Sequence, residues 1–246
     1  MHGSPPPPIP VDLLLLAYRN GIFPMSDGRD DPDVFWVEPK RRAILPLDGF
    51  HLSRSLAKTI RRGRFAVTCN TVFDAVIAAC AAPRPDHPES WISGRIMDSY
   101  RALHRAGAAH SLECWHGREL VGGLYGVGFG RVFCGESMFS RMDDASKVAI
   151  AWLVSLLRRG GGRVLDCQFM TGHLASLGAI EINQARYVAL VAEAAGAGSA
   201  SSAGASDGAA AAGALLPASF EALLGEADGA GVAPEKLILQ SLTHTS

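Results

Sequence analysis

The chain has 246 residues, of which 48% are hydrophobic and 19% are charged, as in an ordinary globular protein with one good-sized domain and a smaller one. The net charge of −1 excludes a global electrostatic attraction to nucleic acid, so any such binding requires a local basic patch. The five scattered cysteines contain no C-x-x-C pair, and the longest aliphatic run, Leu13 to Leu16, is too short to span a bilayer. We therefore expect a cytoplasmic protein without a disulfide framework, a metal site or a membrane anchor.

The N-terminal part predicts a leader followed by a small domain. Residues 1–10 are rich in proline and predict a disordered leader. Residues 11–48 form the predicted small N-terminal domain, which begins with a short helix that Gly21 ends. Short strands are expected at Val34 to Val37 and at Ala43 to Leu45.

Three helices are predicted next, at His51 to Arg62, Thr71 to Ala82 and Ser93 to Ala106. The first of them carries four basic residues at spacing i, i+4, i+7 and i+8, which places them on one side of the helix. We call this set the basic face: Arg54, Lys58, Arg61 and Arg62. A phosphate backbone would offset the mutual repulsion of these charges, but a solvated surface explains the spacing equally well.

The chain changes character after Gly107. Strands are predicted at Ala109 to Trp115, Leu120 to Val127 and Arg131 to Phe139, then a helix from Asp143 or Asp144 to Arg159, a buried strand at Arg163 to Gln168 and a further helix from His173. This order predicts an α+β fold. Its layout resembles the acyltransferases of the GNAT superfamily, so residues 49–191 are expected to form a GNAT-like catalytic domain with an antiparallel or mixed sheet flanked by helices.

The C-terminal part has a biased composition. Residues 192–214 are almost entirely Ala, Gly and Ser, which predicts a flexible linker or insert with at most partial helix. Residues 215–246 contain enough apolar side chains to dock on the catalytic domain, and we expect a short helix and a strand there.

Two polar groups in apolar surroundings are candidates for chemistry. Asp166 and Gln168 are two residues apart on a predicted strand and share one face, where the carboxylate can orient the amide. Taken alone, the pair is better explained by a strand-end carboxylate that caps the following helix. Glu136 interrupts an apolar stretch next to Gly135, and it faces either water or a cavity. The surrounding Met and Phe residues fit an ordinary core equally well.

Two cofactor classes are disfavoured by two segments of the chain. An enzyme that binds coenzyme A in this layout needs a glycine-rich loop between strand and helix, but Ser140 to Ser146 contains no glycine and has two aspartates. Strand alternation also sends Glu113 to the face opposite His110 and Cys114, so these residues do not gather around a metal. No cofactor is expected.

Several ordered motifs resemble one family, the leucyl/phenylalanyl-tRNA–protein transferases, over Leu14 to Tyr187. They are Tyr18 to Pro24, Trp91-Ile92, Ala109 to Trp115, Leu120 to Gly126, Phe133 to Ser140, Ala145 to Lys147, Leu165 to Gln168 and His173 to Ala179. The resemblance implies a monomeric, cytoplasmic enzyme of the bacterial N-end rule degradation pathway. Such an enzyme moves Leu, Phe or Met from aminoacyl-tRNA onto proteins that begin with Arg or Lys.

The resemblance also assigns roles to individual residues. It implies that Asp166 and Gln168 promote attack by the acceptor amine, that Glu136 contacts substrate, and that the basic face binds tRNA. It implies an aminoacyl pocket lined by Phe133, Gly135, Met138, Ser140, Ile150, Leu153 and Leu157. The terminal adenine is expected near Trp91 and Met25. The family often has an aromatic residue in place of Met25, so stacking here either falls to Trp91 or is weaker.

The residues leave parts of the mechanism and the function open. Asp166 either orients Gln168, whose carbonyl oxygen accepts a hydrogen bond from the amine, or takes the proton itself. Glu136 and Asp166 are both candidates for the anionic pocket of the acceptor side chain. An N-acyltransferase that uses an acyl-coenzyme A shares the expected layout, and a non-catalytic RNA-binding module would explain the basic face.

Overall fold

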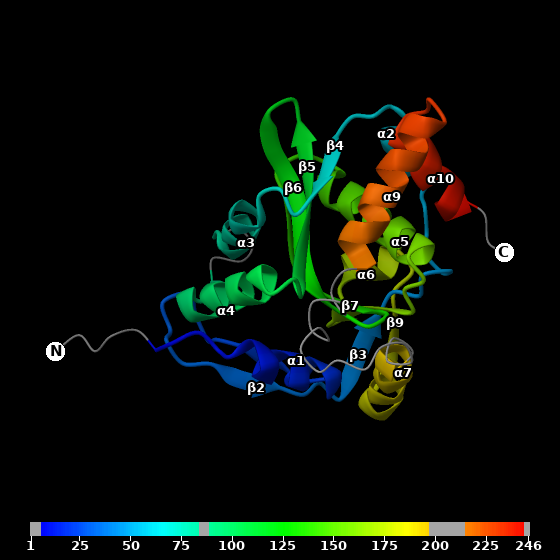
Figure 1. The fold of residues 1–246 in the computed structure, drawn as a ribbon. Coiled ribbons are helices and arrows are strands. Elements are labelled where there is room, and N and C mark those ends of the chain that lie inside the picture. The colour runs from blue at the N-terminus through cyan, green and yellow to red at the C-terminus, as the bar shows by residue number, and fades with distance from the viewer. Residues whose placement is uncertain (1–5, 84–88, 197–214, 244–246) are drawn as a thin grey trace.

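A seven-stranded mixed sheet lies at the centre of the molecule, with helices on both of its faces (Figure 1). The computed structural model describes residues 6–83, 89–196 and 215–243. The strands of the large sheet follow the order β4-β5-β6-β7-β8-β3-β9, and β1 and β2 form a separate two-stranded ribbon. The coarse prediction of an α+β fold with a mixed sheet flanked by helices is therefore confirmed.

The described residues form the following strands and helices. The strands are β1 (Phe23–Met25), β2 (Phe35–Val37), β3 (Arg41–Ile44), β4 (Ala66–Cys69), β5 (Ala109–His116), β6 (Glu119–Phe129), β7 (Val132–Ser140), β8 (Val164–Gln168) and β9 (Ile180–Asn183). The helices are α1 (Val11–Arg19), α2 (Arg54–Arg61), α3 (Phe73–Ala81), α4 (Gly94–Arg105), α5 (Ala145–Arg159), α6 (Gly172–Ser176), α7 (Gln184–Gly196), α9 (Leu215–Gly229) and α10 (Pro234–Thr243).

One parallel pair interrupts an otherwise antiparallel sheet. Strands β4 to β7 form an antiparallel meander, β7 pairs with β8 in parallel, and β3 runs antiparallel to both β8 and β9. The helix α5 makes the crossover from β7 to β8, as a parallel connection requires. Strand β3 comes from the predicted small N-terminal domain of residues 11–48, but it pairs inside the large sheet.

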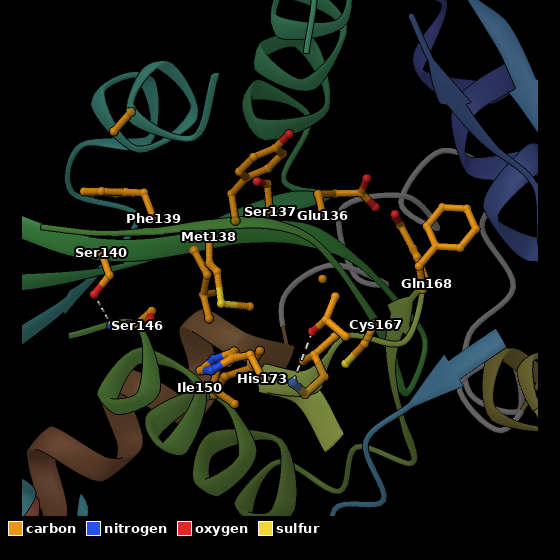
Figure 2. A pocket seen from close by; sticks show the side chains of 18 of the residues that line it. Glu136, Ser137, Met138, Phe139, Ser140, Ser146, Ile150, Cys167, Gln168 and His173 are labelled. Atoms are coloured by element: carbon orange, nitrogen blue, oxygen red, sulfur yellow. Dashed lines mark hydrogen bonds between the residues drawn. The ribbon is translucent and has the colours of Figure 1, made fainter. Parts of the chain in front are cut away.

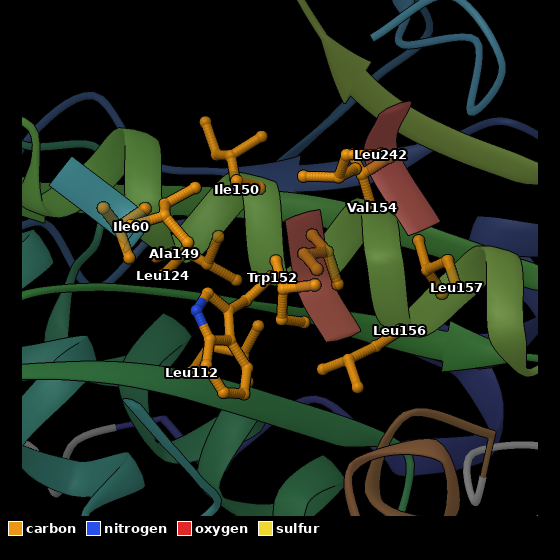
Figure 3. Packing of buried hydrophobic residues seen from close by; sticks show 14 of the residues in the cluster. Ile60, Leu112, Leu124, Ala149, Ile150, Trp152, Val154, Leu156, Leu157 and Leu242 are labelled. Carbon is orange, nitrogen blue, oxygen red and sulfur yellow. The ribbon is translucent and has the colours of Figure 1, made fainter. Parts of the chain in front are cut away.

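Two hydrophobic cores cover the two faces of the sheet. On one face, α5 packs with α2, α9 and α10 around the buried Trp152, which lies next to Leu112 of β5 (Figure 3). On the other face, α1, α3, α4 and α7 enclose a second core that contains Tyr18, Tyr100 and Tyr187. Both cores are needed because the inner strands of the sheet carry apolar side chains on both sides.

Some sequence predictions need correction. Residues 215–243 form the two helices α9 and α10, which pack on α5, and the predicted strand is wrong within these described residues. The last residues of the predicted leader are held in place, because Ile9 is 4% exposed and its N–H donates to Ser99 Oγ at 2.8 Å. Helix α7 extends to Gly196, so the linker predicted for 192–214 begins as helix, and 197–214 lie outside the described residues.

The start of α5 also differs from the prediction. Asp144 occupies the N-cap position, but its backbone is left-handed at φ 70° and its side chain caps no backbone N–H. The carboxylate accepts a hydrogen bond from Thr59 Oγ1 of α2 at 3.1 Å, which joins the two helices. Within the described ranges, no helix is both long and apolar enough to cross a lipid bilayer.

Candidate active site

The candidate site lies where the parallel strands β7 and β8 separate. Their last paired residues are Cys134 and Asp166. Beyond this pair, β7 forms one wall of a cavity of about 690 Å³, and the end of β8 with the residues that follow it forms the opposite wall. Glu136 is two residues beyond Cys134 and Gln168 is two residues beyond Asp166, so the two polar side chains stand at matching places on the two walls.

Most of the predicted aminoacyl pocket lines this cavity. Gly135, Met138, Ser140, Ile150 and Leu153 contribute to its wall, together with other apolar residues that were not predicted: Leu45, Leu124, Leu165, Cys167 and Leu174. Met138 and Ile150 lie close together in Figure 2. The cavity therefore has a mainly apolar chamber built from β7, α5 and β8.

Other residues of the predicted pocket lie outside the cavity wall. Phe133 and Leu157 are buried in the core that surrounds α5, at 1% and 2% exposure. Trp91 lines the cavity, whereas Met25 packs against the second core and is not part of the cavity wall. Of the two residues expected near the adenine, only Trp91 is brought to the cavity.

Asp166 is sealed behind the cavity wall. Its side chain is fully buried and pairs with the equally buried guanidinium of Arg42, at 2.9 Å from Nε to Oδ1 and 2.5 Å from Nη2 to Oδ2. Tyr187 donates its hydroxyl to Oδ2 at 2.9 Å. Arg42 is itself held by the carbonyl of Gly21 at 3.1 Å and lies over the ring of Phe23. These contacts leave Asp166 surrounded by protein donors.

Asp166 also determines the backbone conformation of Gln168. Its Oδ1 accepts the backbone N–H of Gln168 at 2.9 Å, and Gln168 has a positive φ of 61°, which few non-glycine residues adopt. The expectation that the carboxylate orients the side-chain amide is thus corrected, because the contact is to the backbone. The Nε2 of Gln168 is buried and has no hydrogen-bond partner within the described part of the chain.

Glu136 is the acid on the opposite wall. It is 8% exposed, and its Oε2 accepts the hydroxyl of Tyr100 at 2.8 Å, while Tyr100 in turn bonds the hydroxyl of Tyr18. Burial raises the pKa of Glu136 to about 7, against the opposing effect of the nearby Tyr18, Tyr100 and Gln168 side chains. Its Oε1 has no hydrogen-bond partner among the described residues.

The side chains of Glu136 and Gln168, each with one polar atom that has no partner among the described residues, converge. In Figure 2 the carboxylate of Glu136 and the amide of Gln168 point toward one another beside the cavity. Buried polar groups are almost always satisfied in folded proteins, so two unsatisfied ones at one end of a cavity are a sign of a polar ligand. The apolar chamber next to them accommodates an apolar group of the same ligand.

The basic face lies outside the cavity. All four of its side chains are exposed on α2, while Leu56 and Ile60 on the other side of the helix are buried. The predicted division of this helix into a basic and an apolar side is confirmed. The hydrogen bond from Thr59 to Asp144 joins α2 to the beginning of α5, where Ser146 and Ile150 already line the cavity. The basic face is therefore next to an element of the site.

His110 and Glu113, which the sequence analysis considered and rejected as metal ligands, take part in side-chain hydrogen bonds. His110 Nδ1 lies 3.0 Å from Asn70 Nδ2, and Glu113 accepts hydrogen bonds from Ser111 and Thr68. Burial raises the pKa of Glu113. Within the described ranges, no three His, Cys, Asp or Glu side chains are arranged to hold a metal ion.

Several residues around the site were not predicted. Arg42 and Tyr187 hold Asp166, Tyr18 and Tyr100 lie behind Glu136, and His173 lines the cavity. Arg42 had no local signal, since it follows Arg41 in a stretch that resembles a surface. Its partner Asp166 is 124 residues away, and only the pairing of β3 with β8 brings the two together.

Comparisons with known proteins agree on one family. The family models for the leucyl/phenylalanyl-tRNA protein transferase and for its N-terminal domain match residues 44–192 and 8–40. A protein of Novosphingobium aromaticivorans named leucyl/phenylalanyl-tRNA–protein transferase is 60% identical over the full length of both chains. Proteins of the same name from Rhizorhabdus wittichii and Ruegeria sp. (strain TM1040) are 61% and 56% identical. They cover 74% and 75% of this chain, which matches 74% and 86% of theirs.

Proposed function

We propose that this chain, which belongs to the leucyl/phenylalanyl-tRNA protein transferase family, moves Leu, Phe or Met from aminoacyl-tRNA to the α-amino group of proteins that begin with Arg or Lys. The observation that supports this most is the cavity in the β7–β8 split. There an apolar chamber adjoins Glu136 and Gln168, each of which has one buried polar atom without a hydrogen-bond partner among the described residues. We place the reaction in the N-end rule degradation pathway and, since charged tRNA is the donor, in the cytoplasm.

The donor side chain occupies the apolar chamber in this proposal. A cavity of about 690 Å³ is large enough for an aminoacyl group together with part of its adenosine. Met138 is unbranched and adaptable, which suits a pocket that accepts Leu, Phe and Met alike. Side chains branched at Cβ fit less well, and such a shape misfit discriminates by about 1–3 kcal/mol.

The acceptor's N-terminal residue is assigned to the side of the cavity where Glu136 lies. The sequence left Glu136 and Asp166 as alternatives for the anionic pocket, but Asp166 does not line the cavity and its charge is already paired with Arg42. Glu136 lines the cavity, and its Oε1 has no hydrogen-bond partner among the described residues. We therefore place the acceptor's α-amino group, rather than its side-chain cation, next to Glu136.

Gln168 aims the attacking amine. The aminoacyl ester is already activated, so the enzyme gains most by holding the two substrates in the reactive geometry. The hydrogen bond from its backbone N–H to Asp166 fixes Gln168 beyond the end of the β7–β8 pairing. Its side-chain carbonyl oxygen then accepts a hydrogen bond from the amine and directs the lone pair to the ester carbon. Asp166 acts as an orienting residue in this proposal.

The tRNA body is assigned to the basic face. Arg54, Lys58, Arg61 and Arg62 are exposed on a helix attached to the start of α5, so a bound phosphate backbone would lie next to the cavity. The parallel β7–β8 pair that separates around the cavity supports a GNAT-like layout. The start of α5 has Asp144 and no glycine, so this arrangement is used without coenzyme A.

The test is a direct transfer assay. The protein is incubated with tRNA charged with labelled leucine and a peptide that begins with Arg, and the label on the peptide is measured. We expect label on the α-amino group of this peptide and none on a matched peptide that begins with Asp. Turnover of acetyl-coenzyme A without leucyl transfer would contradict the proposal, as would tRNA binding without any transfer.

A further inference from the structure

The proposed reaction needs a group that takes a proton, because the attacking amine loses one when the peptide bond forms. Within the described wall of the cavity, Glu136 is the one carboxyl group. His173 also lines the cavity, but Figure 2 shows it well apart from Glu136, toward Ile150. The proton acceptor must lie where the amine is held, and Gln168 marks that place.

We infer, on the basis of the proposed function, that Glu136 and not Asp166 takes the proton from the attacking amine. The Oε2 of Glu136 is held by Tyr100 at 2.8 Å, which leaves Oε1 as the oxygen without a partner in the described part of the chain. Glu136 and Gln168 converge from the two walls of the split. An amine between them donates one hydrogen to Gln168 and another to Oε1 of Glu136.

Asp166 is unsuited to this role because all its hydrogen-bonding positions are used. Arg42 donates to both oxygens, Tyr187 donates to Oδ2 and the backbone of Gln168 donates to Oδ1. A proton on Asp166 would leave the guanidinium of Arg42 buried without a counter-charge, which strongly disfavours protonation at this position. Asp166 is also fully buried, so the amine cannot reach it without displacing Gln168.

The step balances with Glu136 as both acceptor and donor of the proton. The neutral α-amine attacks the ester carbon and a C–N bond forms, while the amine proton moves to Oε1 of Glu136. The C–O bond to the 3′-oxygen of the terminal ribose then breaks. That oxygen takes the proton back from Glu136 as the carbonyl re-forms, and Glu136 returns to its carboxylate form.

The surroundings of Glu136 suit this exchange near neutral pH. Burial raises its pKa to about 7, the range in which one group both accepts and returns a proton efficiently. The neighbouring ionisable groups are Tyr18, Tyr100, Tyr125, Cys134 and Asp166. Burial keeps the three tyrosines and Cys134 neutral in this range by raising the pKa of each. The charge of Asp166, although paired with Arg42, adds to the upward shift of the Glu136 pKa.

The experiment compares pH–rate profiles of single-turnover transfer from Leu-tRNA to an Arg peptide, for the wild type and for Glu136→Gln. The glutamine keeps the volume and the acceptor for Tyr100. We expect the wild-type rate to rise with pH around a midpoint near 7, and we call this rise the limb of the profile. In the variant this limb should be absent, and the rate at saturating substrates should fall by at least about 100-fold. A peptide with an aminooxy group in place of its amine separates this limb from the titration of the amine itself, near pH ~8.

A second variant keeps the inference testable if Glu136→Gln does not fold. The hydroxyl of Tyr100 lowers the pKa of Glu136, so Tyr100→Phe should move the limb to higher pH. Asp166→Asn should slow transfer but leave the limb in place.

Three results would overturn the inference. They are an unchanged profile in Glu136→Gln, a loss that high peptide concentration fully restores, or a limb that disappears only in Asp166→Asn. Failure of the wild type to transfer leucine would refute the proposed function, and the inference with it, whereas these three results leave transfer by the wild type intact.

Discussion

The clearest thermodynamic consequence of the site concerns the stability of the protein as the pH changes. Glu136 is buried, and its pKa is about 7 in the folded protein, compared with an ordinary value of 4.5. The folded state therefore holds the Glu136 proton more tightly than the unfolded state does. This contribution to stability is fully present below pH 4.5 and is lost as the pH rises through about 7.

The magnitude follows from the difference between the two pKa values, since one unit corresponds to about 1.4 kcal/mol. The whole effect is about 3 kcal/mol, and most of it falls between about pH 5 and about pH 8. Glu136→Gln removes this titration while it keeps an acceptor for Tyr100. Compared with the variant, the wild type should lose about 2–3 kcal/mol of unfolding free energy over that interval.

Urea unfolding of both proteins at several pH values measures this effect. The difference between the two free energies cancels the titration of all other carboxylates, which both proteins share. Glu119→Gln, an exposed substitution on β6, is the matched control and should stay within about 0.5 kcal/mol of the wild type. A wild-type to Glu136→Gln difference that remains constant over the whole pH range would refute the reasoning about burial.

Two single substitutions and one fourfold replacement test the remaining parts of the site. Arg42→Met should destabilise the fold by about 3–5 kcal/mol because it leaves Asp166 unpaired. In urea unfolding, the double variant with Asp166→Asn should lose less unfolding free energy than the two single variants lose together. Strictly additive losses would contradict the pairing. Leu153→Trp should fill the apolar chamber of the cavity and reduce the rate of Phe transfer more than the rate of Leu transfer. The affinity for tRNA, measured by filter binding, should stay unchanged. An equal reduction for both donors would place the donor side chain elsewhere. Replacement of all four residues of the basic face by Gln should weaken tRNA binding. It should also reduce the slope of the logarithm of the tRNA binding constant against the logarithm of the salt concentration by up to about 3, whereas Arg118→Gln on the β5–β6 turn should change neither. An unchanged slope would argue against a phosphate contact at α2.

Local sequence patterns were sufficient for several elements in and around the site. The alternation in β5, the buried run of β8 and the basic spacing of α2 are all short-range signals, and each element formed within a few residues of its prediction. The interrupted apolar stretch around Glu136 left water, a cavity and an ordinary core open, and the structure places Glu136 at a cavity wall. Five of the seven pocket residues that the family resemblance implied line this cavity.

Long-range pairing was the part that local patterns did not reveal. Arg42 resembles a surface residue beside Arg41, and the sequence does not show that β3 enters the sheet between β8 and β9. Without this pairing Asp166 seems free to act in the cavity, whereas with it the carboxylate is sealed behind the wall. The left-handed backbone of Gln168 also depends on Asp166, so the actual contact between the two differs from the one that strand alternation suggested.

The position of the donor in the β7–β8 split is the central claim, and a crystal structure with an amide-linked phenylalanyl adenosine tests it most directly. The amide replaces the reactive ester, so the complex is stable. We predict that the phenyl ring lies among Met138, Ile150 and Leu153 and that the carbonyl carbon lies at the end of the cavity where Glu136 and Gln168 converge. A ring bound outside this chamber, or a carbonyl group far from Gln168, would contradict the account.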